Sequence, residues 1–193
     1  RAGVYRTVPE AKGSKILGAH WVQVGGDGRR ERVVLLERWI VVAGRGVGEG
    51  DFYYYALPHG PDYRYDSLEV QDLTGDDGAE FLVRYRVTYP GQLEQHFLAI
   101  YRLHFDSVNL VFLAEVGNSG PGWTVTNDVK FDSKGPGKTS RVIVSKPVAT
   151  GVTKATYKDV DAELITDWDK VLLPWTGPAT RTYEWQDTQF LKR

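Results

Sequence analysis

The chain has 193 residues, of which 41% are hydrophobic and 25% are charged. This composition fits one folded domain with a sizeable core and excludes a disordered chain. The 24 basic and 25 acidic residues nearly cancel, so the clustered positive charge that nucleic-acid binding depends on is not expected. The longest apolar stretch, residues 33–43, is interrupted by Glu37 and Arg38 and is much shorter than the roughly 20 residues of a transmembrane helix.

Cysteine and methionine are both absent. Without cysteine the chain has no disulfide, no thiolate zinc site and no cysteine nucleophile. Without an initiator methionine, Arg1 is not expected to be the translated start. A cleaved secretion signal is one ordinary cause, and a trimmed terminus is another.

The first third of the chain predicts three strands, at residues 16–25, 31–43 and 51–57. The middle segment is apolar on both faces, which is typical of a strand in the centre of a sheet. The third contains the run Tyr53, Tyr54 and Tyr55. Because neighbouring residues of a strand point to opposite faces, we expect at least one of these tyrosines to face outward.

Residues 66–116 predict a four-stranded meander about the size of one propeller blade. Apolar residues alternate with polar ones from Phe81 to Tyr89, which predicts a strand with one packed and one wet face. Residues 95–103 and 109–116 repeat the pattern, and turn-forming residues separate these segments.

A third unit of strands is predicted at residues 123–132, 139–146 and 182–191. Between them, residues 159–168 could form a short helix or a loop, and residues 172–175 predict a buried edge strand ended by Pro174. We therefore expect an all-β fold with antiparallel meanders, forming either propeller-blade-like repeats or an open β-sandwich or barrel. The prediction is one domain over residues 1–193, with possible repeat units at 16–57, 66–116 and 123–191.

Residues 72–80 place oxygen-bearing side chains at alternate positions around a glycine turn. This arrangement suits a hard cation, since calcium accepts six to eight oxygen ligands. The candidate ligands are the side chains of Asp72, Thr74, Asp76 and Glu80 and the backbone carbonyl of Gly78.

The same loop resembles the calcium loops of the FG-GAP (integrin α-type) propeller repeats, which run Asp-x-Asp/Asn-x-Asp-Gly-x-x-Asp between two strands. Thr74 stands where the family prefers Asp or Asn, Asp77 where it has Gly, and Glu80 where it has Asp. The glycine position often needs a positive φ, which Asp tolerates less well than Gly. The resemblance implies a structural calcium ion and a location outside the cytoplasm: secreted, periplasmic or attached to the cell envelope.

Two weaker copies of the loop suggest a repeat. In residues 21–31, Asp27 and Glu31 align with Asp76 and Glu80, while Gln23 and Gly25 replace the first two ligands. In residues 129–140 lysines replace the carboxylates. The alternative is three unrelated hairpin turns, because Asp-Gly is also a common hairpin signal. Three units are too few for a closed propeller of four to eight blades, so a larger assembly is one expectation.

No residue pattern predicts a reaction, so we expect a non-catalytic binding or scaffold module with a protein partner. The alternative is a carbohydrate-binding domain. The six Trp and eleven Tyr support it, because exposed aromatic side chains suit sugar contacts. Cross-strand packing of the aromatics is the competing explanation. A third hypothesis is a hydrolase whose acids are Asp72, Asp76 and Asp77, which requires a deep pocket at that loop. The aromatic residues favoured for exposure, besides the three tyrosines, are Trp123, Trp168, Trp175 and Trp185.

Overall fold

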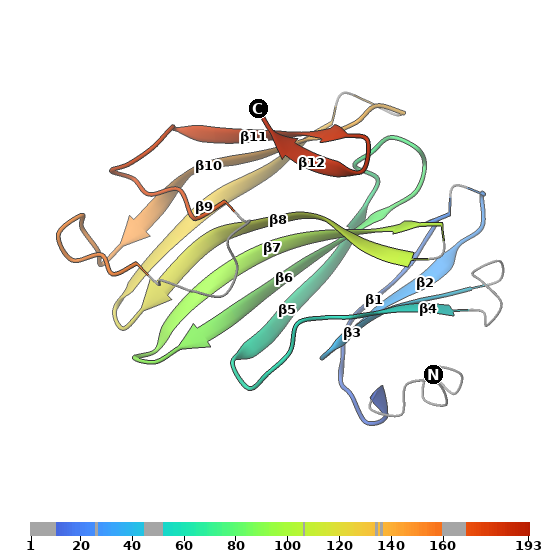
Figure 1. Cartoon of the computed structure of the whole chain (residues 1–193), viewed down its shortest axis with the longest axis horizontal. Helices are drawn as coiled ribbons and strands as arrows, with labels where there is room; N and C mark the ends of the chain where they lie inside the picture. Colours follow the sequence, from blue (N-terminus) through green and yellow to red (C-terminus); the bar gives the residue numbers. More distant parts are fainter. Residues whose placement is uncertain are drawn as a thin grey trace.

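The computed structural model describes residues 11–25, 27–44, 52–105, 107–133, 135, 137–159 and 169–193. These residues form two open antiparallel sheets, which confirms the all-β prediction (Figure 1). The smaller sheet has the order β1-β2-β3-β4, and the larger has the order β12-β11-β10-β9-β8-β7-β6-β5. The strands of the smaller sheet are β1 (Ile16–Val22), β2 (Glu31–Leu36), β3 (Trp39–Ala43) and β4 (Phe52–Ala56). Those of the larger sheet are β5 (Tyr63–Gln71), β6 (Glu80–Tyr89), β7 (Leu93–His104), β8 (Ser107–Gly120), β9 (Trp123–Asp132), β10 (Arg141–Thr150), β11 (Thr180–Gln186) and β12 (Gln189–Lys192).

Two predicted strands are each a pair of strands. Residues 31–43 fold back at Glu37 and Arg38, so that β2 pairs with β3. These two charged residues are exposed at the turn, where water solvates them, and the flanking apolar runs share one sheet. Residues 182–191 likewise turn at Asp187, which has a φ of 52°, between β11 and β12.

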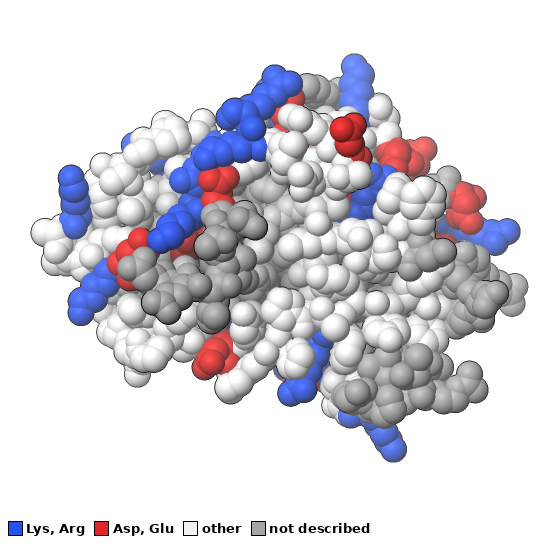
Figure 2. Space-filling view, viewed as in Figure 1, with Lys and Arg blue, Asp and Glu red and all other residues white. Residues whose placement is uncertain are grey.

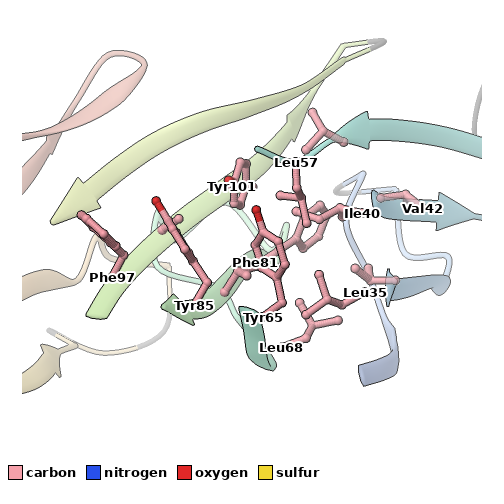
Figure 3. Packing of buried hydrophobic residues seen from close by; sticks show 14 of the residues in the cluster. Leu35, Ile40, Val42, Leu57, Tyr65, Leu68, Phe81, Tyr85, Phe97 and Tyr101 are labelled. Atoms are coloured by element: carbon pink, nitrogen blue, oxygen red, sulfur yellow. The ribbon is translucent and has the colours of Figure 1, made fainter. Parts of the chain in front are cut away.

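The first hydrophobic core lies between the two sheets. Aromatic side chains of β5, β6 and β7 point toward the aliphatic side chains of the smaller sheet (Figure 3). At the edge of this core β1 lies against β5, and a Cβ on Gly18 would come within 2.8 Å of the Leu68 Cβ. Glycine therefore permits the close approach of the two sheets. The core includes Leu35, Ile40, Val42, Leu57, Tyr65, Leu68, Phe81, Tyr85, Phe97 and Tyr101.

A second core lies on the opposite face of β6, β7 and β8. β8 pairs with β9 over Gly117–Gly120 and Trp123–Thr126. The strands β9 to β12 pack over β6, β7 and β8. The core between them includes Leu82, Leu98, Phe112, Val142 and Tyr183. The prediction that the second face of β6 is wet is therefore wrong for Leu82, which this layer buries.

The segment of residues 169–173, here called the strap, fills the opening between β8 and β9. The backbone N–H of Glu115 donates to the carbonyl of Asp169 (3.1 Å), and the side-chain amide of Asn127 bonds both backbone groups of Leu172. The predicted edge strand at residues 172–175 is therefore wrong, because a side chain and not a neighbouring strand satisfies this backbone. Most of the short helix considered at 159–168 lies outside the described residues.

Across the part of the chain that the structure describes, no helix has the length and apolar character needed to cross a membrane.

Candidate functional site

The predicted calcium loop, here called the middle corner (residues 72–80), connects β5 to β6. Both Asp72 carboxylate oxygens accept backbone hydrogen bonds, from Gly75 N–H at 2.7 Å and from Asp77 N–H at 3.1 Å. Gly75 and Asp77 have φ values of 76° and 66°. The expected positive φ at position 77 is thus confirmed, and the two bonds to Asp72 hold the loop in this left-handed conformation.

Asp76 and Glu80 complete the internal bonding of the middle corner. One oxygen of Asp76 accepts bonds from the Thr74 hydroxyl (2.9 Å) and the Gly78 N–H (3.2 Å). Glu80 is fully buried at the start of β6 and accepts bonds from the N–H groups of Leu73 (2.7 Å) and Thr74 (3.3 Å). The corner is therefore stabilised by its own carboxylates, which cap otherwise unpaired backbone donors.

The sequence-based prediction did not include Arg102, although its guanidinium supplies the positive charge of this corner. Arg102 lies near the end of β7, with its Nε 3.5 Å from a Glu80 oxygen, and it also bonds the second oxygen of Asp76. All six carboxylate oxygens of Asp72, Asp76 and Glu80 therefore face a donor. Burial raises the pKa of Glu80 to about 7, and the bond from Leu73 and the charge of Arg102 oppose that rise.

This geometry bears directly on the predicted calcium ion. The five predicted ligand residues do lie in one loop, but among the described residues no three Asp, Glu or His side chains group closely enough to hold a metal. An ion at this place would have to displace Arg102 from Asp76 and Glu80 and break backbone bonds. Calcium binding at residues 72–80 stays a prediction. The observed arrangement favours the Arg102 guanidinium, and not a metal ion, as the cation of this loop.

The first corner (residues 23–31) repeats part of this design between β1 and β2. Glu31 is buried at the start of β2 and accepts a bond from the Val24 N–H at 3.1 Å, seven residues earlier, as Glu80 does from Leu73. Asp27, which aligns with Asp76, accepts a bond from the Arg29 N–H (2.9 Å). In the third corner (residues 132–140) the aligned residue is Ser140, which is also buried.

The three corners lie side by side and are joined through their backbones. Ala79 N–H donates to the Gln23 carbonyl (2.9 Å), and Ser140 N–H donates to the Leu73 carbonyl (2.7 Å). Gly75 sits so close to the third corner that a Cβ on it would be 2.6 Å from the carbonyl carbon of Lys138. The three loops that the sequence aligns are therefore one contiguous row, with the middle corner bonded on both sides.

A cleft of about 310 Å³ lies beside the middle corner, between the ends of β7 and β8 and the turn from β11 to β12. The Arg102 guanidinium lies 5.1 Å from the centre of the Trp185 ring, a cation–π distance, and both residues line the cleft. Asn109, Asp187 and Gln189 add polar groups. Asp72, Asp76 and Asp77, the acids of the hydrolase hypothesis, do not line this cleft, so the cleft gives that hypothesis no support.

The aromatic residues divide between packing and exposure. Tyr54 is 45% exposed, which confirms that one of the three tyrosines faces outward, and Trp21, which the sequence did not single out, is 64% exposed. Trp123 and Trp175 pack edge-on against Tyr157 and are half-buried. Trp168 lies outside the described residues.

On the face seen in Figure 2, Lys and Arg side chains gather along the upper left, with Asp and Glu side chains among them. Ion pairs among the described residues include Lys192 with Asp169 at 2.8 Å.

No family model, no curated protein and no solved structure matches this chain. The similarity to FG-GAP repeats accordingly rests on the loop residues alone and stays a prediction.

Proposed function

We propose that this protein is a non-catalytic binding or scaffold module that acts outside the cytoplasm and binds a protein partner. The observation that carries the proposal is the row of corners, in whose middle loop the carboxylates of Asp72, Asp76 and Glu80 are engaged by internal hydrogen bonds and by Arg102. Groups bonded in this way stabilise a rigid frame and are not free to act on a substrate. A rigid frame suits a module that presents a fixed surface.

The strand edge next to this frame supports a protein partner. The edge of β8 from residue 107 to residue 113 pairs with β7 on one side, and no other described strand pairs with it on the other. A cleft of about 420 Å³ is lined by this edge and by β12, and Leu110 and Leu191, respectively 43% and 38% exposed, lie on its walls. An open strand edge with exposed apolar side chains is typical of a surface that another chain covers.

The test compares two arginine substitutions of exposed apolar residues. Leu110→Arg places a charge at the cleft, while Val148→Arg, at an exposed position of β10 that does not line it, is the control. Binding is measured by chemical cross-linking and mass spectrometry of the tagged chain in its native cells. We expect one partner to cross-link to wild type and to Val148→Arg at β8 or β12 and to be lost from Leu110→Arg. Equal cross-linking by all three chains, or no reproducible partner, would contradict the proposal.

The alternative, a carbohydrate-binding domain, is favoured by one specific observation, the cleft that Trp185 and Arg102 share with Asn109 and Gln189. An aromatic ring with polar neighbours suits a sugar. A titration with a panel of oligosaccharides, followed by tryptophan fluorescence, tests it. Saturable binding that Trp185→Phe abolishes and Trp21→Phe leaves intact would favour the carbohydrate hypothesis over a protein partner.

A further inference from the structure

A second polar cleft, of about 500 Å³, lies on a part of the molecule that the proposed function does not use. It is enclosed by the segment leading into β1, the turn between β2 and β3, the connection from β4 to β5, and the start of β5. Its polar and aromatic lining comprises Lys15, Glu37, Arg38, His59, Tyr63, Arg64, Tyr65 and Asp66.

The basic side chains of this cleft are poorly neutralised. Within the described ranges, neither Lys15 nor Arg38 takes part in an ion pair, and Arg64 has only a long one, 3.6 Å from Asp66. Asp66 is already engaged, because both of its oxygens accept bonds from the Arg86 guanidinium at 2.9 Å. Three permanent cations therefore share the cleft with a single uncommitted carboxylate, that of Glu37.

The uncharged groups of the cleft are suited to a bound polar ligand. The Tyr65 hydroxyl is fixed by a bond to the Pro58 carbonyl (2.5 Å), and the ring of Tyr63 is stacked on that of Tyr85. His59 bonds the Leu57 carbonyl through Nδ1 (3.2 Å), and since a carbonyl only accepts, Nδ1 carries a proton. The lining is thus partly preorganised, while the cationic side chains remain exposed.

We propose that this cleft binds an oxyanion, a phosphate, sulfate or carboxylate group, which is either free or carried by an acidic saccharide. Arg and Lys are the side chains that bind such groups through charge-assisted hydrogen bonds. An anion between Lys15, Arg38 and Arg64 would offset their mutual repulsion, which Glu37 alone does not balance. The site is independent of the β8 edge and of the row of corners.

The first experiment titrates inorganic phosphate into the whole chain at low ionic strength, with binding followed by amide chemical shifts. We expect saturable shifts at the cleft residues, weakened by added NaCl because salt screens exposed charges. The double variant Lys15→Gln/Arg38→Gln should lower the affinity by about tenfold or more, since two charge-assisted contacts are lost. Arg84→Gln is the control, because Arg84 is a half-buried arginine that pairs with Glu69 and does not line the cleft.

A second arm identifies the source of the anion with a sulfated hexasaccharide. A free anion is indicated if the hexasaccharide binds no more tightly than phosphate, and an acidic saccharide if it binds at least about tenfold more tightly and Tyr63→Ala removes that gain. The proposal is overturned if neither probe saturates, or if the double variant and Arg84→Gln bind as wild type does. It is also overturned if both variants weaken binding equally. Thermal melting of each variant shows whether it is folded, and exposed charged residues are expected to change stability little.

Discussion

The first and middle corners share one hydrogen bond but differ in how its charge is balanced. In both, a buried glutamate at the start of a strand accepts a bond from a backbone N–H seven residues earlier. Only Glu80 also accepts a hydrogen bond from a second backbone N–H, and only Glu80 lies beside an arginine. No described cation forms an ion pair with Glu31. The shared bond therefore defines the shape of the corner, and Arg102 is an addition specific to the middle corner.

The substitution Glu80→Ala tests the middle corner most severely. It leaves the Leu73 and Thr74 N–H groups without their acceptor and leaves the largely buried Arg102 with Asp76 alone. Above pH 7, where Glu80 is ionised, removing one partner of a buried ion pair costs about 3–5 kcal/mol, and we expect a loss of free energy of unfolding in that range at about pH 8. Urea denaturation measures it. A loss below about 1 kcal/mol would mean that Glu80 does not hold the corner together.

The second prediction concerns pH. Burial raises the pKa of Glu80 and of Glu115 to about 7, against an ordinary value of 4.5, and for Glu115 the bond from the Val171 N–H opposes the rise. Between these values the folded chain binds more protons than the unfolded chain, so the free energy of unfolding falls as pH rises from 4.5 through 7. The stabilisation that each protonated glutamate gives the folded chain is complete below pH 4.5 and lost above pH 7. It amounts to at most about 3 kcal/mol for each group.

Denaturation of wild type across this pH range, compared with Glu80→Gln/Glu115→Gln, measures the pH effect. The double variant cannot ionise at these positions, so its pH slope should be smaller. Identical slopes for the two chains would show that neither glutamate retains its proton in the folded state.

Glu31→Ala should have a smaller effect than Glu80→Ala. It removes the acceptor of one backbone donor, Val24 N–H, for which we expect a loss of about 1–3 kcal/mol. Ser140→Ala in the third corner is the control, because the buried Ser140 hydroxyl has no hydrogen-bond partner among the described residues and its removal should change stability by less than about 0.5 kcal/mol. The expected order of destabilisation is Glu80→Ala, then Glu31→Ala, then Ser140→Ala. Any other order would contradict the conclusion that the middle corner depends on its glutamate more than the other two corners depend on the aligned residues.

The smallest expected effect concerns calcium. If Arg102 takes the place of an ion, then Arg102→Gln should gain a response to calcium, with its melting temperature raised by about 2–4 °C and lowered again by a chelator. Wild type should respond less, and Arg102→Gln/Asp76→Asn not at all. No response from any of these chains would end the calcium hypothesis, and an equal response of wild type and Arg102→Gln would show that the arginine does not compete.

Alternation of apolar and polar residues was enough to predict most strands, because a strand with one buried face has a period of two. It failed where burial is not one-sided. The apolar segment at 31–43 gave no sign of its turn beyond Glu37 and Arg38, and Leu82 gave no sign that a second layer covers it. Both depend on contacts between segments distant in the sequence, which a local pattern does not contain.

The candidate site could be predicted only in part, because a local pattern does not contain contacts between distant segments. The middle corner and its aligned copies are local, so their residues could be found in the sequence, and Glu31 and Glu80 do occupy equivalent places. Arg102 lies 22 residues beyond Glu80, and only the pairing of β6 with β7 brings the two together. The cleft that holds Trp185 needs β7, β8 and β11 at once. The one local signal for Arg102 was a charged residue near the end of an apolar strand.

The strands β6, β7 and β8 are covered on both faces, and this shared layer determines how the molecule unfolds. Detaching the smaller sheet strips one side of these strands, and detaching β10 to β12 strips the other. Either event exposes side chains that the remaining half cannot shield, so neither half is a good candidate to persist alone. We therefore expect the three successive meanders to melt together as a single cooperative unit.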